Sequence, residues 1–368
     1  MTARVLAAGV LLCSGGCSIV FGDAEYYGGS TSQSTSDGTG AGGSASSGGG
    51  SNPSVIAADV FVVGGYHDVL GQPEGTFDAW RGEIDADGSV RAWLHVAPLN
   101  TTGRFVAAAS STGLRAYGFS SLSLGVEDAQ NVRGYSLELG MPAAQWSLVA
   151  SHLLAFSQTD SCVPPGPAAL NAQLLFVFAD CTVPARGAFV FEVNETTGAI
   201  GALKALKKPS LVGPTSSFTF VGDELYGVGG DNTPSAVAHI TLGTDTVFSE
   251  TTSLPDPVPL AGLCSDGRRL YVAGGPNRKV YWADGEAAGA LGDWSSTADV
   301  PIAADGPACF FHGGRGYFFG GLEDDGDDAP LTVTSGTHEG GAFVPDTLEH
   351  APIPYPRGQM HAVVVPRP

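Results

Sequence analysis

Short hydrophobic segments that end at a pair of glycines recur along the chain. The clearest copy, residues 270–275, reads LYVAGG, and three others have the same form. A run of four apolar residues that are largely aromatic or β-branched is typical of a strand, and glycine lets the chain turn where φ is positive. The pattern therefore predicts strands that end in tight turns. The glycine pairs are Gly64 and Gly65, Gly229 and Gly230, Gly274 and Gly275, and Gly320 and Gly321.

These segments recur at a nearly regular spacing. Two weaker copies, residues 114–119 and 175–180, lack the glycine pair, and with them the successive steps are 54, 61, 50, 45 and 46 residues. Repeats of roughly 40–50 residues are typical of propellers and solenoids. A third strand follows each copy, and an aromatic residue then begins a fourth, so that each period predicts one four-stranded blade. These aromatic residues are Trp93, Trp146, Phe248, Trp294 and Phe343.

The repeat resembles the kelch repeat. In that family the second strand ends in Gly-Gly, the third carries a tyrosine and the fourth begins with a tryptophan. The resemblance covers residues 55–368 and implies a kelch-type β-propeller. The matching residues are Gly229, Gly230, Gly274, Gly275, Gly320 and Gly321 for the glycine pair, Tyr135 and Tyr281 for the tyrosine, and Trp93, Trp146 and Trp294 for the tryptophan.

The two ends of the repeat region complete each other. Residues 58–65 have the form of a second strand without a first, and residues 356–365 have the form of a first strand with nothing after it. Joined, they make one blade, which is the ring closure expected of kelch propellers. Counting second strands predicts an all-β fold of six blades. Seven blades would result if residues 119–180 contained a further one.

The first residues have the form of an export signal. Arg4 precedes the apolar run 5–12, which is too short to span a bilayer. Small residues then lead to Cys17, and this resembles the box of bacterial lipoproteins in which the cysteine carries lipid. Residues 1–16 would be the signal peptide. Ser18, rather than aspartate, follows the cysteine, which by the same resemblance favours the outer membrane.

Two alternatives to lipidation at Cys17 stay open. Cys13 is a second candidate, although the residues before it are larger, and an ordinary cleaved secretory signal would carry no lipid. Residues 17–54 consist mainly of Gly, Ser and Thr, which cannot bury enough apolar surface to fold. We therefore expect a flexible tether with a root-mean-square length of about 30 Å.

The chain is acidic. It has 37 Asp and Glu against 17 Lys and Arg, a net charge of −20, which argues against nucleic acid and anionic lipid as partners. The densest acidic stretch, residues 323–328, follows the glycine pair of the sixth copy. It is either a solvated turn or a Ca²⁺ site, with Asp324, Asp325, Asp327 and Asp328 as candidate ligands. No other cofactor is expected. Residues 85–88 predict a hairpin turn.

Four cysteines follow Cys17: Cys162, Cys181, Cys264 and Cys309. An even number in an exported chain predicts two disulfides. Of the three connectivities we favour Cys162–Cys181, which would close a proline-rich insertion, and Cys264–Cys309, at equivalent sites on the inner strands of adjacent blades. Four buried free thiols are the alternative.

No catalytic motif stands out in the sequence. H-E-x-x-H and G-x-S-x-G are both absent. His361 and Arg357 match residues that inner kelch strands often carry, and His152 and His312 are further candidates to face the axis. Copper radical oxidases, sialic-acid mutarotases and sialidases have comparable propellers, but their site residues cannot be traced in this chain.

We therefore expect a monomeric, lipid-anchored binding module rather than an enzyme. Loops at the blade ends would recognise a protein or glycan of the bacterial cell envelope. Tyr66, Trp80 and Trp282 are candidate contact residues if blade packing does not bury them. A carbohydrate-acting enzyme of the mutarotase kind and a purely structural envelope lipoprotein are the alternatives.

Overall fold

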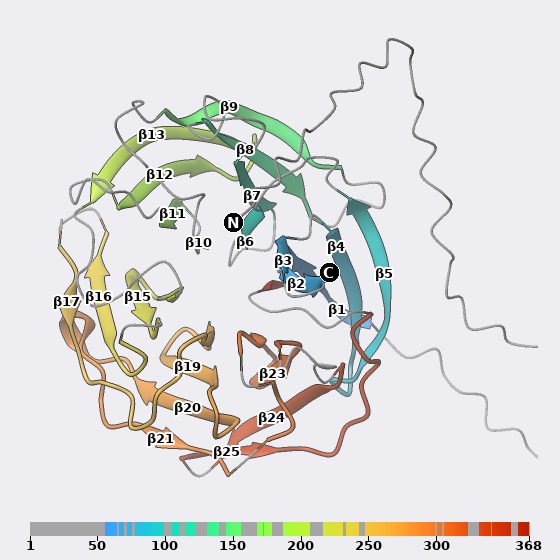
Figure 1. The fold of residues 1–368 in the computed structure, drawn as a ribbon. Helices are drawn as coiled ribbons and strands as arrows, with labels where there is room; N and C mark the ends of the chain where they lie inside the picture. The colour runs from blue at the N-terminus through green and yellow to red at the C-terminus, as the bar shows by residue number, and fades with distance from the viewer. Residues whose placement is uncertain are drawn as a thin grey trace, which may run out of the picture. The chain divides into compact units, whose positions relative to one another are not determined.

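The structure is a six-bladed β-propeller, as predicted. It is a computed structural model in which six four-stranded antiparallel sheets surround a common axis (Figure 1). The residues it describes are 56–64, 66–69, 72–75, 78–98, 105–109, 115–121, 131–139, 145–155, 168–171, 173–178, 187–206, 216–230, 233–242, 247–298, 300–303, 305–322, 331–339, 341–354 and 360–367.

Each blade consists of four strands, named in order from the innermost to the outermost. Blade 1 contains β26 (His361–Pro366), β1 (Ile56–Val63), β4 (Asp78–Asp85) and β5 (Val90–Pro98). Blade 2 contains β6 (Phe105–Ala109), β7 (Arg115–Ser121), β8 (Asn131–Glu138) and β9 (Ser147–Ala155). Blade 3 contains β10 (Ala168–Leu170), β11 (Leu174–Phe178), β12 (Ala188–Asn194) and β13 (Ala199–Leu206). Blade 4 contains β14 (Ser217–Val221), β15 (Glu224–Val228), β16 (Val237–Thr241) and β17 (Ser249–Glu250). Blade 5 contains β18 (Gly262–Ser265), β19 (Arg269–Gly274), β20 (Lys279–Asp284) and β21 (Ser295–Ser296). Blade 6 contains β22 (Ala308–His312), β23 (Arg315–Phe319), β24 (Val333–Glu339) and β25 (Ala342–Pro345).

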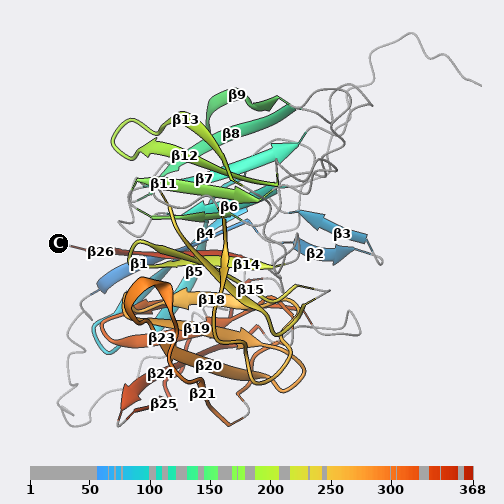
Figure 2. The same ribbon diagram turned by 90° about the vertical axis from the view of Figure 1, so that its left-hand side faces the viewer.

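The C-terminal strand closes the ring, as the sequence predicts. β26 pairs antiparallel with β1, from Ala58 opposite Pro366 to Val63 opposite His361, and Figure 2 shows the two strands side by side. The innermost strands of successive blades contact one another all the way round, including β22 with β26 and β26 with β6. Blade 1 therefore joins the two ends of the repeat region.

The second strands are buried on both faces, which explains their unbroken apolar runs. Alternate residues of a strand point to opposite sides. In β19, Leu270 and Val272 pack against blade 4, whereas Tyr271 and Ala273 pack against blade 6 beside Phe318. Each blade thus adheres to both neighbours through one central strand.

The glycine pairs turn the chain where the second strands end. All of their described members have positive φ, for example 72° at Gly229 and 108° at Gly230. A Cβ on Gly229 would overlap the carbonyl oxygen of Val258, on the connection that leads to blade 5. Glycine is required here both for its backbone angle and for the close approach of two chains.

The two faces of the ring differ. We call the side on which the second strands end the loop face, and the opposite side the turn face. On the turn face, several pairs of consecutive strands are joined by two-residue turns such as Gly222–Asp223 and Gly313–Gly314, while β20 and β21 are joined by the longer segment 285–294. The loop face carries the described connections between blades and also a hairpin that the sequence did not predict, β2 (Tyr66–Val69) with β3 (Gln72–Gly75). Figure 2, which views the ring from its edge, shows β2 and β3 outside the blade sheets.

Helical structure is minimal in the described part of the chain. It comprises the single 3₁₀ turn η3 (Ala287–Gly289), and the run of Leu, Ala and Lys near residue 204 forms the outer strand β13. None of the described segments is a helix that is long and apolar enough to cross a membrane.

Candidate functional site

Several predicted site residues lie outside the described residues. The lipid site, one disulfide, the acidic stretch, one glycine and one arginine are in this group and stay predictions. They are Cys17, Cys162, Cys181, Asp324, Asp325, Asp327, Asp328, Gly65 and Arg357.

The predicted disulfide between Cys264 and Cys309 is confirmed. It joins β18 to β22, with the two Cα atoms 5.6 Å apart and both residues buried. The expectation that the two positions are equivalent was wrong. Cys264 lies opposite Tyr271, two residues before Ala273 on β19, whereas Cys309 lies opposite Phe318, one residue before the matching Phe319 on β23. Facing side chains must come from opposite faces of their sheets, and this requires an offset of an odd number of residues.

Two tryptophans at or near the start of a fourth strand fasten blades 1 and 5 to the blade before each. Trp294 donates its indole N–H to the carbonyl oxygen of Thr252 at 2.9 Å, and Trp93 donates to that of Ala351 at 3.2 Å. Both carbonyls lie on the chain that leaves the preceding blade. The aromatic positions of the repeat therefore have a structural role.

The third-strand tyrosine acts in the same region. Tyr281 donates its hydroxyl to Asp256 Oδ2 at 2.9 Å, on the connection between blades 4 and 5, and Lys279 lies 3.6 Å from the same carboxylate. The tyrosine hydrogen bond, first among several contacts, lowers the pKa of Asp256. Tyr135, the corresponding residue of blade 2, is buried among apolar side chains.

A second set of tyrosines was not predicted from the sequence. They occupy the second strands and reach the next blade: Tyr226 donates to Gly289 O at 3.1 Å, and Tyr317 donates to Gly88 O at 2.9 Å. Burial raises the pKa of each to about 12. The sequence did contain a signal for this set of tyrosines, because the repeat copies LYGVGG, LYVAGG and GYFFGG all have tyrosine at the second position. The set consists of Tyr117, Tyr226, Tyr271 and Tyr317.

A serine, a histidine and an aspartate meet at the outer side of blade 6. Ser335 Oγ lies 2.7 Å from His350 Nε2 and 2.8 Å from Asp346 Oδ1. The backbone N–H of Val90 donates to His350 Nδ1 at 3.0 Å. Since a backbone N–H can only donate, the ring proton of neutral His350 lies on Nε2, and burial lowers the pKa of this histidine.

The hydrogen bonds of this trio run in the direction opposite to those of a serine hydrolase. There the histidine accepts the serine proton and the carboxylate holds the histidine. In this protein His350 donates to Ser335, which in turn donates to Asp346, and Ser335 is only 2% exposed. The trio holds the chain leaving blade 6 against blade 1 and does not form a nucleophile.

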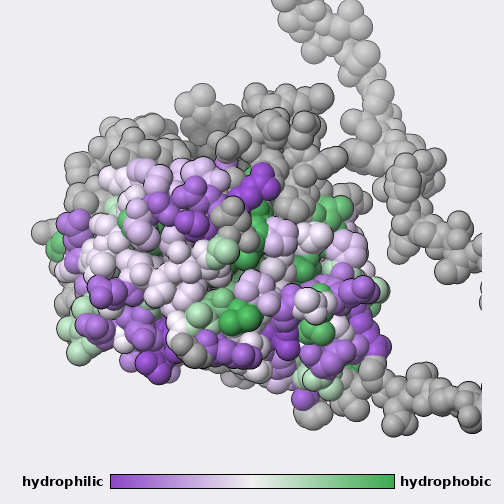
Figure 3. Space-filling view, turned by 90° about the horizontal axis from the view of Figure 1, so that it is seen from below, coloured by the Kyte–Doolittle hydropathy of each residue, from purple (hydrophilic) through white to green (hydrophobic). Residues whose placement is uncertain are grey.

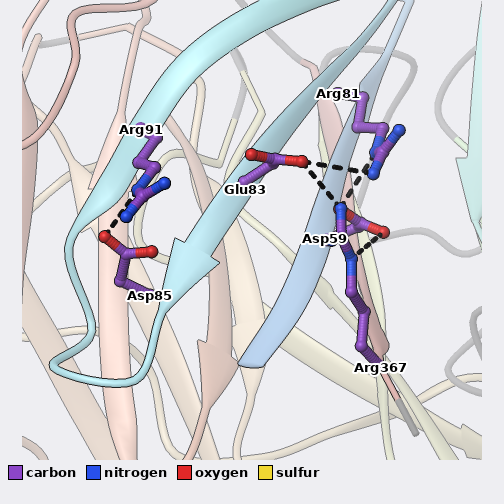
Figure 4. A network of polar contacts seen from close by, with 6 residues as sticks. All are labelled: Asp59, Arg81, Glu83, Asp85, Arg91 and Arg367. Carbon is purple, nitrogen blue, oxygen red and sulfur yellow. Dashed lines mark hydrogen bonds and ion pairs between the residues drawn. The ribbon is translucent and has the colours of Figure 1, made fainter. Parts of the chain in front are cut away.

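A cluster of four charged residues lies where the ring closes (Figure 4). The carboxylate of Asp59 on β1 accepts three hydrogen bonds. One comes from Arg81 Nε at 2.9 Å, and two come from Nε and Nη2 of Arg367 at 3.0 and 2.7 Å. Arg367 Nη2 also donates to Glu83 at 2.8 Å. Hydrogen bonds to Asp59 and then Glu83 raise the pKa of Arg367. Asp59 is only 6% exposed, so the network offsets the cost of burying its charge. We call these four residues the closure network.

Two of the three candidate contact aromatics can be placed. Trp282 is buried between blades 5 and 6, so blade packing removes it from the candidates. Trp80 is half-buried with its ring 4.8 Å from that of His95. The side chain of Tyr66 lies outside the described residues.

Apolar exposure is scattered over the described surface. The exposed large hydrophobic residues are Leu94, Leu148, Val247, Leu331 and Val344, which belong to four different blades. Figure 3 views the rim formed by blades 5 and 6 and shows small separate hydrophobic areas among hydrophilic ones. Single exposed apolar residues of this kind are normal for soluble surfaces.

Two of the three histidines considered for the axis lie on inner strands. His361 begins β26 and His312 ends β22, and both are half-buried. Burial lowers the pKa of His312, and it lowers the pKa of His361 to about 4. Both side chains are therefore neutral at pH 7. The side chain of His152 lies outside the described residues.

His361 should make the fold sensitive to acid. The unfolded chain takes up this proton near pH 6.5 and the folded chain only near pH 4, so its contribution is full above about pH 6.5 and is lost as the pH falls towards 4. Because the side chain is half-buried, we expect a loss of about 1–3 kcal/mol. Urea unfolding at pH 7.5 and 4.5 measures this loss. The difference between the two pH values should shrink by that amount in His361→Gln, and an unchanged difference would refute the assignment.

The described residues hold no group of three or more His, Cys, Asp or Glu side chains placed to bind a metal ion. Their polar side chains instead link strands and blades. No protein-family model and no curated protein matches this chain, so its propeller fold and the contacts above are the basis for assigning a function.

Proposed function

We propose that the chain is a kelch-type propeller of a lipid-anchored envelope protein, and that its loop face binds a protein or glycan of the cell envelope. The observation that carries this proposal is the difference between the faces. The β2–β3 hairpin and the described connections between blades lie on the loop face, whereas several strands on the turn face are joined by tight two-residue turns and the longest described connection there is the segment 285–294 that contains η3. Rigid scaffolds usually carry binding residues on such connections.

The kelch assignment is supported by the roles of its signature residues. The glycine pairs have positive φ, and Tyr281 and Trp294 hold the connection between blades 4 and 5. Each signature position thus serves blade packing, as expected for a repeat that defines an architecture. Lipidation at Cys17 and the outer-membrane location rest on the sequence alone.

A binding role fits the described chemistry better than catalysis does. In the described serine–histidine–aspartate cluster the hydrogen bonds run in the direction opposite to that needed for a nucleophilic serine. The acidic groups of the closure network are already paired with arginines. A carbohydrate-acting enzyme would need an acid and a base free to face the axis. The net charge of −20 favours neutral or basic partners.

The β2–β3 hairpin offers a direct test of the loop face. We would replace residues 66–75 by Gly-Gly in the full chain and measure co-sedimentation with isolated peptidoglycan and with outer-membrane vesicles. The variant should lose at least about 1.4 kcal/mol of binding free energy, a tenfold weaker affinity. Asp223→Asn, in a turn of the opposite face, is the control and should bind as the native chain does.

Three outcomes would contradict the proposal. Equal loss in both variants, or none in the hairpin variant, would remove the loop face as the binding surface. No binding of the native chain to either probe would remove the envelope-binding role and favour a structural or catalytic one.

A further inference from the structure

Hydrogen bonds fasten the outer part of the interface between blades 4 and 5. Trp294 donates to Thr252 O at 2.9 Å, and the hydroxyl of Thr252 donates to Leu291 O at 3.0 Å. The N–H of Leu291 donates to Thr251 Oγ1 at 3.1 Å. The chain leaving blade 4 is thus tied to the start of the outer strand of blade 5.

The interface between blades 6 and 1 is fastened in the same way. Trp93 donates to Ala351 O at 3.2 Å, and the N–H of Ala351 donates to Val90 O at 2.7 Å. The N–H of Val90 donates to His350 at 3.0 Å. Here too the chain that leaves one blade pairs with the outer strand of the next.

The interface between blades 5 and 6 lacks the matching donor. Phe343 takes the aromatic position: its ring packs on Gly336 of the third strand, as the ring of Trp93 packs on Gly82. Phenylalanine has no N–H to donate. Side-chain hydrogen bonds of the described residues at this interface are long: the hydroxyls of Thr332 and Thr334 lie 3.5 Å from Pro301 O, and that of Tyr271 lies 3.5 Å from His338 Nδ1. The backbone N–H of Gly306 donates to Leu260 O at 2.8 Å, between the segments that enter the two inner strands.

This same interface carries the Cys264–Cys309 disulfide. We propose that the disulfide, which joins the innermost strands, compensates for the weaker hydrogen bonding at the outer part of this interface, and that the 5–6 interface is therefore a redox-sensitive seam of the ring. A dithiol reductant supplies two electrons and two protons, so that Cys264 and Cys309 become thiols and the reductant becomes a cyclic disulfide. The buried apolar cluster around Phe318 and Trp282 remains, together with the Tyr271–His338 contact and the Gly306–Leu260 hydrogen bond, but the covalent link between the two inner strands is lost.

The seam is independent of what the loop face binds. A disulfide restrains the open chain, and the two cysteines are 45 residues apart in sequence. It forms in oxidising compartments and is lost in reducing ones. Reduction should thus loosen one defined interface, while the hydrogen-bonded interfaces on either side keep their strength.

Hydrogen exchange of the full chain, with and without dithiothreitol, tests this proposal. Reduction should speed exchange in β18 and β22 by at least about thirtyfold, the lower end of the usual effect of losing a native disulfide. Exchange in β15 and β5, outside the seam, should stay within about threefold of the oxidised value. The double variant Cys264→Ala, Cys309→Ala should show the same pattern without reductant.

Trp294→Phe is the matched control. It removes the indole N–H at the 4–5 interface, so exchange there should rise in the oxidised protein while the 5–6 interface stays protected. If reduction raised the exchange rate uniformly, or if another interface of the ring opened first, the proposal of a seam between blades 5 and 6 would be wrong. Unchanged exchange in β18 and β22 after complete reduction of both cysteines, verified by thiol alkylation, would also contradict the proposal.

Discussion

A chain that ends before His361 should lose its ordered ring rather than only its last strand. Removing β26 leaves β1 without its inner partner from Ala58 to Val63 and uncovers the apolar cluster around buried Val363. Several hydrogen bonds at about 1 kcal/mol each and the buried valine at about 1.5–3 kcal/mol are lost together. Since domains are stable by only about 5–15 kcal/mol, the truncated chain should not unfold cooperatively in urea.

Addition of the missing strand provides the check on this truncation. A synthetic peptide of residues 360–368 should restore cooperative unfolding and near-ultraviolet circular dichroism. Arg367→Ala, which removes only one arm of the closure network, should cost about 1.5–3 kcal/mol and keep the ring closed. A truncated chain that unfolds as cooperatively as the native one would show that ring closure contributes little.

Gly229→Ala should be among the most damaging single substitutions in the repeat. The residue has a φ of 72°, and its new Cβ would overlap the Val258 carbonyl oxygen. The backbone angle costs about 1–2 kcal/mol and the displaced connection should bring the total to about 3 kcal/mol or more. Urea unfolding of the purified variant measures this loss.

Gly222→Ala separates the two causes. Its φ is 60°, but a Cβ there meets nothing within 4 Å. The expected cost is therefore that of the backbone angle alone, about 1–2 kcal/mol. If both variants lose the same stability, close approach of the chains is not what requires glycine at the end of the second strand.

The architecture could be predicted because its signals are local and repeated. The glycine pairs mark strand ends, and the half-blades at residues 58–65 and 356–365 are visible as incomplete units. Register between blades is not local. It depends on how two sheets face each other, so the offset between Cys264 and Cys309 could not be derived from their places in the repeat.

The β2–β3 hairpin and the polar links between blades could not be predicted from the sequence, for different reasons. Pro73, which pairs with Asp68 of β2, is a residue that argues against a strand. The sequence of β2 and β3 also lacks the alternation of apolar and polar residues that would have indicated a pair of strands. The Ser335, His350 and Asp346 trio joins residues of common types whose spacing carries no information. Only the direction of the hydrogen bond from Val90 shows that they serve packing.

The closure by β26 also sets the order in which the protein can fold. Asp59 and Arg367 are 308 residues apart in sequence, and their bond can form only after synthesis has passed Arg367. Contacts of such long range are slow to form. Until then blade 1 lacks its inner strand, and no ring exists to fix the other five blades. A chain that crosses a membrane unfolded would in this way postpone its final structure until the last strand has arrived.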